Sequence, residues 1–163
     1  MSSHNTIVPI LTSLFATAAL AEPPTAAVEA YMAGSQVIVA ELNKSEPNVG
    51  TITTTITAML EHAKPVVFAF GEKHTQCAEQ LARMIELYPQ IEIWSAAEIR
   101  RNIEAGSQLP RAEGCYAARD VVAHPAIVRA ITRAGVLGQQ ARLLREMNEA
   151  IEHMQEISTD LSE

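Results

Sequence analysis

Residues 33–70 read AGSQVIVAELNKSEPNVGTITTTITAMLEHAKPVVFAF, in which two apolar runs rich in β-branched residues flank a polar loop and a threonine-rich segment. Continuous apolar runs of this length are typical of parallel strands that are covered by helices on both faces. We therefore expect strands at 35–42 and 64–71. Between them the sequence predicts a loop at 43–50 and a helix at 51–63.

The same alternation of strand and helix extends to both sides of this segment. We expect further elements as follows: a strand at 6–11, a helix at 25–34 that ends at Gly34, a helix at 72–88, a strand at 89–95 and a helix at 96–106. Regular alternation implies a parallel sheet with right-handed crossovers between layers of helices. The sequence thus predicts a three-layer Rossmann-like (flavodoxin-like) α/β domain over residues 1–106.

Residues 107–163 have a different character and are expected to form a helical C-terminal extension. Residues 107–124 are irregular in pattern, and helices are expected at 125–135 and 139–157. Apolar residues recur at spacings of three and four in the second helix, namely at Leu144, Met147, Ile151 and Met154. This stripe packs either against the core of the chain itself or against a partner or a second copy.

The composition restricts the classes of function. The chain has 163 residues, 48% of them hydrophobic, and a formal net charge of −7. Nucleic-acid affinity comes mostly from Lys and Arg that neutralise phosphates, so we expect no nucleic-acid partner. The arginines between Arg100 and Arg145 are interleaved with acidic residues, which favours a solvated helical face.

The N-terminal run at 7–21 is open to two interpretations. It ends in the small-x-small pattern Ala19-Leu20-Ala21, as a secretory leader does. However, Pro9 interrupts it and no Lys or Arg precedes Lys44, so a cytoplasmic or organellar location is expected and secretion is the alternative. The run is too short and too rich in Ser and Thr to span a bilayer, and we expect no membrane association.

Cysteines and histidines give no sign of a cofactor or metal. Cys77 and Cys115 are the only two cysteines, and their spacing supports neither a disulfide framework nor a zinc site. We expect reduced thiols in the core, no metal and no cofactor. Four histidines that lie in predicted helices or beside them have no serine or cysteine partner at a catalytic spacing; they are His62, His74, His124 and His153.

A ligand pocket is predicted where the expected strands end. In an open parallel sheet, ligands bind beyond the carboxyl ends of the strands, and the amides of a helix N-terminus can receive a phosphate. The residues predicted to bind a ligand there are Glu41, Asn43, Ser45, Asn48, Gly50, Thr51 and Gly71.

The stretch SQVIVAELNKSEPNVG, followed by a helix and KPVVFAF, resembles the nucleoside 2-deoxyribosyltransferase family. It is most similar to the branch of 2′-deoxynucleoside 5′-phosphate N-hydrolases, and the similarity covers roughly residues 6–104. The resemblance implies a catalytic glutamate in the helix turn after Gly50, because an oxocarbenium-like centre needs a carboxylate. That position holds Ile52. The family's opening strand also has no counterpart, so the resemblance implies a sheet truncated at the N-terminus with an open edge.

These departures predict a non-catalytic structural or protein-interaction subunit, of the kind that can form part of a larger assembly. It would bind a protein partner or itself through the open sheet edge and the C-terminal helix. The alternative is an enzyme that cleaves or transfers at the N-glycosidic bond of (deoxy)nucleosides or their 5′-monophosphates, with Glu41 or Glu46 as the acid. Nucleotide binding without turnover lies between the two.

Overall fold

The computed structural model describes residues 24–104, 114–135 and 137–163, and every regular element in these ranges is helical. The elements are α1 (Pro24–Leu42), α2 (Val49–Lys73), α3 (Thr75–Glu86), α4 (Tyr88–Ile91), α5 (Ala96–Ile99), a π-helical turn η1 (Arg100–Glu104), α6 (Cys115–Arg133), a 3-10 turn η2 (Leu137–Gln139) and α7 (Gln140–Ser162). The prediction of a Rossmann-like α/β sheet is therefore wrong for the described chain. The strand predicted at 6–11 and the leader-like run at 7–21 lie outside the described residues.

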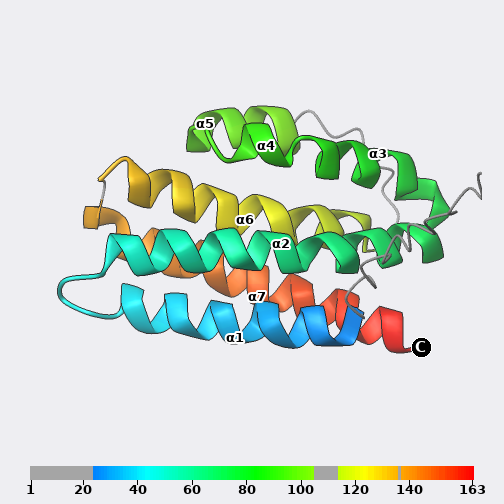
Figure 1. Cartoon of the computed structure of the whole chain (residues 1–163), viewed down its shortest axis with the longest axis horizontal. Coiled ribbons are helices and arrows are strands. Elements are labelled where there is room, and N and C mark those ends of the chain that lie inside the picture. The colour runs from blue at the N-terminus through cyan, green and yellow to red at the C-terminus, as the bar shows by residue number, and fades with distance from the viewer. Residues whose placement is uncertain (1–23, 105–113, 136) are drawn as a thin grey trace, which may run out of the picture.

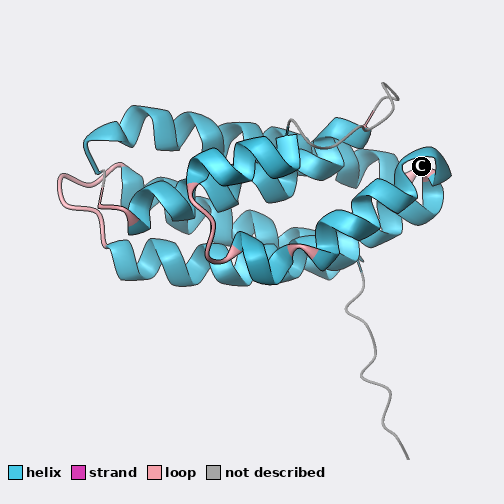
Figure 2. Cartoon of the chain, turned by 90° about the horizontal axis from the view of Figure 1, so that it is seen from above, coloured by secondary structure: helices cyan, strands magenta, loops and turns pink. Residues whose placement is uncertain are grey.

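The four long helices α1, α2, α6 and α7 form a bundle in which α1 and α6 each pack against α2 and α7, and α2 and α7 also pack against each other (Figure 1). Two views at right angles show helices and connecting loops throughout the described chain (Figure 2). The short segments from α3 to η1 lie outside the bundle, along α6 and the end of α2. This leaves α6 enclosed on several sides, with 15 of its 19 residues buried. None of the described helices has the length and apolar content needed to cross a bilayer.

The segment 35–42 is helical because its apolar residues follow a helical spacing once the preceding residues are included. The residues of α1 that reach the core are Tyr31, Ile38 and Leu42, together with the small Ala27 and Ser35. A strand buried on both faces would cover Val37, yet Val37 is 44% exposed. Gly34 lies within α1 instead of ending it. A Cβ there would lie 2.6 Å from Cγ of Met59, so this glycine lets α1 and α2 approach closely.

The predicted strand at 64–71 is the last part of α2. Val66, Val67 and Phe70 are buried, but Phe68 between them is 59% exposed, which is a helical pattern of burial. Pro65 lies inside this helix. Threonines in the first half of α2 bond to its backbone, since the Thr53 hydroxyl donates to the Val49 carbonyl at 2.8 Å and the Thr57 hydroxyl to the Thr53 carbonyl at 3.1 Å.

The later segments mix correct and wrong expectations. The helix predicted at 72–88 is confirmed as α3, whereas the strand predicted at 89–95 is α4 followed by a turn, with Ile93 75% exposed. The segment 96–106 was predicted as one helix, and its described part contains α5 and η1. Helix α6 begins at Cys115, inside the segment predicted to be irregular. In α7, Met147 and Met154 of the predicted stripe are buried in the core of the chain itself.

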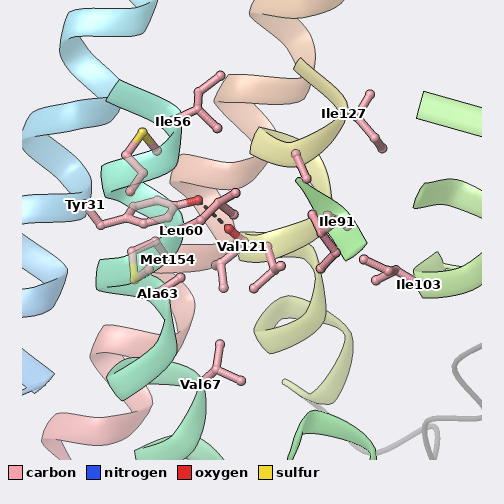
Figure 3. Close-up of a cluster of buried hydrophobic side chains, with 14 of the residues drawn as sticks. Tyr31, Ile56, Leu60, Ala63, Val67, Ile91, Ile103, Val121, Ile127 and Met154 are labelled. Carbon is pink, nitrogen blue, oxygen red and sulfur yellow. Dashed lines mark hydrogen bonds between the residues drawn. The ribbon is translucent and has the colours of Figure 1, made fainter. Parts of the chain in front are cut away.

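Pro125 creates a specific demand in the middle of α6. A proline has no backbone N–H, so the Val121 carbonyl one turn earlier lacks its usual helical donor. The Tyr31 hydroxyl, reaching across the bundle from α1, donates to that carbonyl at 2.8 Å (Figure 3). Tyr31 is fully buried, and burial is the main cause that raises its pKa. The side chain thus satisfies its own hydroxyl and the orphaned acceptor in α6 together.

A disulfide joins Cys77 near the start of α3 to Cys115 at the start of α6, with Cα atoms 6.0 Å apart. The expectation of reduced thiols is therefore wrong. Both cysteines are fully buried. The preceding Gly114 has φ +82°, and a Cβ there would lie 2.7 Å from Cζ of Phe70, so both backbone and packing require glycine at this position.

Tyr31→Phe is expected to lower the free energy of unfolding by about 1–3 kcal/mol, because it leaves the buried Val121 carbonyl without a donor. In a Pro125→Ala background the cost should be much smaller, since residue 125 then supplies a backbone N–H. Urea unfolding of the four proteins of this double-mutant cycle measures the difference. Equal costs of Tyr31→Phe in both backgrounds would contradict the assignment.

Loss of the disulfide is expected to lower stability by about 4 kcal/mol, the loop-closure value for the sequence separation of 38 residues. Equilibrium unfolding of the wild type with and without reductant measures this loss. The Cys77→Ser/Cys115→Ser variant should match the reduced wild type and should not respond to reductant. If the unfolding midpoint of the wild type were the same with and without reductant, the disulfide would be absent.

Candidate functional site

Of the residues predicted to bind a ligand, Glu41, Asn48 and Thr51 lie close together, and their hydrogen bonds stabilise the turn between α1 and α2. Glu41 at the end of α1 accepts hydrogen bonds from Lys44 Nζ at 2.5 Å and from the Asn48 amide at 3.1 Å. These bonds, that of Lys44 first, lower the pKa of Glu41. The Asn48 side chain accepts from the Thr51 amide at 2.9 Å and caps α2. Both groups hold the turn between α1 and α2.

The other predicted positions do not converge on a pocket. Ser45, Glu46 and Gly50 are exposed, and the Asn43 amide donates to a carbonyl within its own helix. Gly71 lies at the opposite end of α2, about 30 Å from Gly50 at the helical rise per residue. Ile52, where the resemblance implies a catalytic acid, is fully buried in the bundle core.

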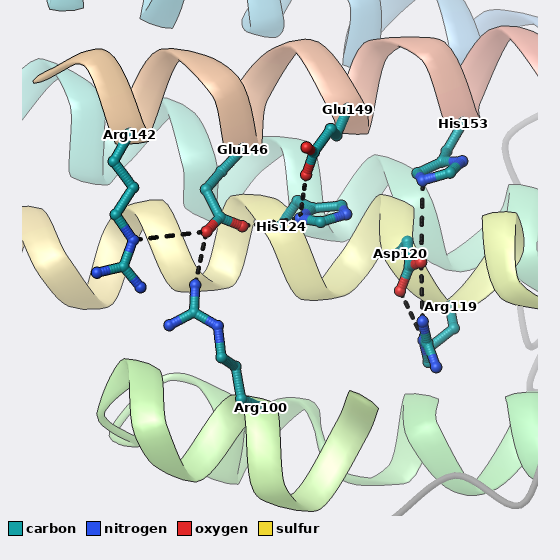
Figure 4. Close-up of polar contacts among 8 residues, drawn as sticks. All are labelled: Arg100, Arg119, Asp120, His124, Arg142, Glu146, Glu149 and His153. Carbon is teal, nitrogen blue, oxygen red and sulfur yellow. Dashed lines mark hydrogen bonds and ion pairs between the residues drawn. The ribbon is translucent and has the colours of Figure 1, made fainter. Parts of the chain in front are cut away.

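The largest group of interacting ionisable side chains within the described ranges lies between α6 and α7 (Figure 4). We define the α6–α7 cluster as Asp120, His124, Glu146, Glu149 and His153. The two α6 residues are four apart, and the three α7 residues are spaced by three and four. These spacings place each set on one face of its helix, and the two faces meet.

His124 lies at the centre of the cluster. Its Nδ1 is 2.8 Å from Oε2 of Glu146 and 3.6 Å from Oε2 of Glu149. Its ring stacks on that of His153, with centroids 5.7 Å apart and planes 10° from parallel. Because the His124 side chain is only 12% exposed, these contacts largely replace solvent around the imidazole.

Asp120 and His153 form the other half. His153 Nε2 is 3.8 Å from Oδ2 of Asp120, and its Nδ1 is 3.7 Å from Oε2 of Glu156 on the next turn of α7. Both oxygens of Asp120 accept from the Arg119 guanidinium, at 2.6 and 2.8 Å. This bidentate pair fixes the orientation of the Asp120 carboxylate.

Arginines complete the surroundings of the cluster, and the predicted solvated arginine face holds for some of them, such as the exposed Arg101 and Arg145, but not for Arg129. Arg100 of η1 donates to Oε1 of Glu146 at 2.5 Å, and Arg142 Nε lies 3.8 Å from the same oxygen. Arg129, on another side of α6, is only 4% exposed, and its Nη1 lies 3.2 Å from the Thr57 hydroxyl. Of Arg100, Arg142 and Arg129, only Arg129 is buried, whereas the other two contact Glu146 and remain 34% and 37% exposed.

The environment shifts the pKa values of the central pair in opposite directions. Burial alone would lower the pKa of His124, but the hydrogen bond with Glu146 and the charges of Asp120, Glu146 and Glu149 raise it above its ordinary 6.5. Burial alone would raise the pKa of Glu146, but His124, Arg100 and Arg142 lower it below 4.5. The charged forms of both groups therefore favour each other.

Two sets of three side chains within the cluster have the geometry of a metal site. They are Asp120–His124–His153 and His124–Glu146–Glu149, and within each set the three ligand atoms lie within 4.8 Å of one another. Ligand atoms around a tetrahedral metal lie about 3.3 Å apart. Small side-chain rotations would therefore suffice to close either set around one ion.

The sequence contained one usable sign of this cluster, the spacing of Asp120 and His124. It was missed because Pro125 indicated a helix start directly after both residues, so they fell in a segment predicted to be irregular. Comparison of the chain with protein-family models, curated proteins and solved structures gives no match. Function therefore has to be inferred from the residues of the cluster.

Glu146→Gln is expected to destabilise the metal-free protein by about 1–3 kcal/mol, because it removes the charged partner of a buried imidazole. Because the pKa of His124 is raised in the folded state, this group stabilises the fold fully below pH 6.5, and the contribution is lost as pH rises through the folded-state pKa. Because the pKa of Glu146 is lowered in the folded state, this group stabilises the fold fully above pH 4.5, and the contribution is lost as pH falls through the folded-state pKa. The loss should thus be largest between pH 4.5 and 6.5.

Urea unfolding across this pH range, with a chelator present, measures the loss, and NMR titration should show a lower His124 pKa in the variant. Glu152→Gln is the matched control, since Glu152 is exposed on the same helix. A His124 pKa that is unchanged by Glu146→Gln would refute the proposed pairing.

Proposed function

We propose that the protein binds a divalent transition-metal ion between α6 and α7, with Asp120, His124 and His153 as its ligands. The observation that supports this most is the convergence of two imidazoles and a carboxylate from two helices, with ligand atoms within 4.8 Å of one another. Helical bundles commonly build metal sites in this way, from side chains on facing helices.

The hydrogen bond of His124 and the carboxylate near His153 Nδ1 favour this set over the one containing Glu146 and Glu149. Metal-bound histidines usually donate their second ring N–H to a carboxylate, which fixes the tautomer. His124 Nδ1 faces Glu146 at 2.8 Å, and His153 Nδ1 faces Glu156 at 3.7 Å. Donation from Nδ1 leaves the lone pair of each imidazole on Nε2. On His153 that nitrogen faces Asp120.

The arginine at Asp120 is compatible with a metal ligand at the same carboxylate. Each carboxylate oxygen has two lone pairs, so Asp120 can accept from Arg119 and still bind an ion. The arginine then holds the carboxylate in place for the ion, as groups hydrogen-bonded to metal ligands do.

The donor types indicate which ions would bind. Imidazole suits Zn²⁺, Cu²⁺, Ni²⁺ and Fe²⁺, whereas Ca²⁺ and Mg²⁺ prefer shells made only of oxygen. Three protein ligands leave at least one coordination position for water or another ligand. Because the imidazoles must be neutral to bind, and the pKa of His124 is raised, affinity should increase with pH.

The compartment also belongs to this proposal. Disulfides persist in oxidising compartments and are rare in the cytosol. The buried Cys77–Cys115 bond therefore favours an oxidising compartment over the cytoplasmic location expected from the sequence, and it supports the secretory alternative for the run at 7–21. Transition-metal ions in such a compartment would meet a protein whose thiols are already paired.

The functions predicted from the sequence stay predictions. A protein-interaction role is untouched by the cluster, although the described chain offers no sheet edge for it. The N-glycosidic alternative depended on Glu41 or Glu46, of which Glu41 braces a turn and Glu46 is exposed. The residues on which these two predictions were based do not include any member of the α6–α7 cluster.

Calorimetric titration with ZnCl₂ is expected to show one site, and bound Zn²⁺ should raise the unfolding temperature. His153→Ala should weaken binding by more than about tenfold, because even second-shell groups are worth about 10- to 100-fold in metal affinity. His62→Ala on α2 is the matched control, and CaCl₂ should not compete. An absence of Zn²⁺ binding, or equal losses in both histidine variants, would refute the proposal.

A further inference from the structure

A groove lined by both polar and apolar residues lies beside the α6–α7 cluster, where η1 meets the end of α6 and the start of α7. It has a volume of about 900 Å³. We define the arginine groove by Arg100, Arg101 and Arg142 and by Ala97, Ala130 and Ile131, all of which line it. Its volume lies within the range of about 300–1,000 Å³ that is usual for small-molecule sites.

The charge of this groove is opposite to that of the whole chain. Three arginines line one groove in a protein of net charge −7. Arg101 is exposed, and its charge contributes to lowering the pKa of Glu98, but it forms no hydrogen bond or ion pair with any residue that the structure describes. Arg142 bonds Gln139 through Nη1 and faces Glu146 through Nε, so its Nη2 has no such partner in the same part of the chain. The groove therefore offers guanidinium donors to an anion.

The lining adds a second requirement for the ligand. Small apolar side chains from α5 and α6 also line the groove, among them Ala97, Ala130 and Ile131. Guanidinium groups bind carboxylates through paired hydrogen bonds, while the walls favour burial of an apolar group. Neither an inorganic anion nor a neutral alkane uses both features.

We propose that the arginine groove binds an amphipathic organic anion, with a carboxylate head at Arg101 and Arg142 and an apolar body against the alanine-rich walls. The site is separate from the metal ligands, although Arg100 and Arg142 also contact Glu146 (Figure 4). Anion binding does not require the metal and can be measured with a chelator present.

Titration calorimetry in chelator tests the site with dodecanoate below its critical micelle concentration. We expect one bound dodecanoate per chain and weaker binding at high salt, because screening weakens a contact between charges. Acetate has the carboxylate head of dodecanoate but no apolar tail. Dodecyltrimethylammonium has the apolar tail but a positively charged head. Both should therefore bind at least about tenfold more weakly than dodecanoate.

Variants locate the site. Arg142→Gln and Arg101→Gln should each weaken dodecanoate binding by about tenfold, the effect of losing a charge-assisted hydrogen bond. Arg145→Gln, three residues from Arg142 on the same helix and exposed, should leave binding unchanged. Since Arg101 is exposed and forms no hydrogen bond or ion pair in the described ranges, its variant tests the site even if Arg142→Gln fails to fold. No binding of dodecanoate, equal binding of the cation or of acetate, or an equal effect of Arg145→Gln would overturn the proposal.

Discussion

The Tyr31 hydroxyl reaches the Val121 carbonyl at the one turn of α6 where Pro125 removes the backbone donor. Through this contact the outer helix α1 is matched to the most enclosed helix of the bundle. Only a long side chain with a polar tip can cross an apolar core and end on a carbonyl without leaving a void. The bond thereby fixes how α1 is placed along the bundle, and with it the surface that α2 and α7 pack against.

The placement of α6 determines the chemistry. Asp120 and His124 lie on the turns directly before Pro125, so any shift of this segment would move both side chains away from α7. On the other side of the helix, Arg129 is buried towards α2. Several of the polar groups on this enclosed helix have a partner of opposite charge or a hydrogen-bonding group, which limits the cost of burying them. Nη2 of Arg129 and the Thr132 hydroxyl are buried without a hydrogen-bond partner in the described chain.

Some of this could be predicted from the sequence. The amphipathic spacing in α3 and α7 identified both helices, since periodicity over several turns is a strong signal. The apolar runs around Val37 and Phe68 were misjudged, because a short β-branched run fits a buried strand and a helix equally well and only exposure separates the two. The resemblance to the nucleoside 2-deoxyribosyltransferase family and the predicted ligand pocket at Glu41 both depended on interpreting those two runs as strands. The disulfide and the α6–α7 cluster depend on contacts between distant segments, which spacing alone does not show.

Glu146 connects two regions that differ in chemistry. One of its oxygens faces the arginines of the groove and the other faces His124. The disulfide has a different kind of effect, because it turns the backbone from Cys77 to Cys115 into a covalent ring. A protease that cut this ring once, anywhere along it, would produce two polypeptides still linked by sulfur, with α1 and α2 in one piece and α6 and α7 in the other. Such a nicked molecule would keep its bundle helices tethered and would separate only on reduction.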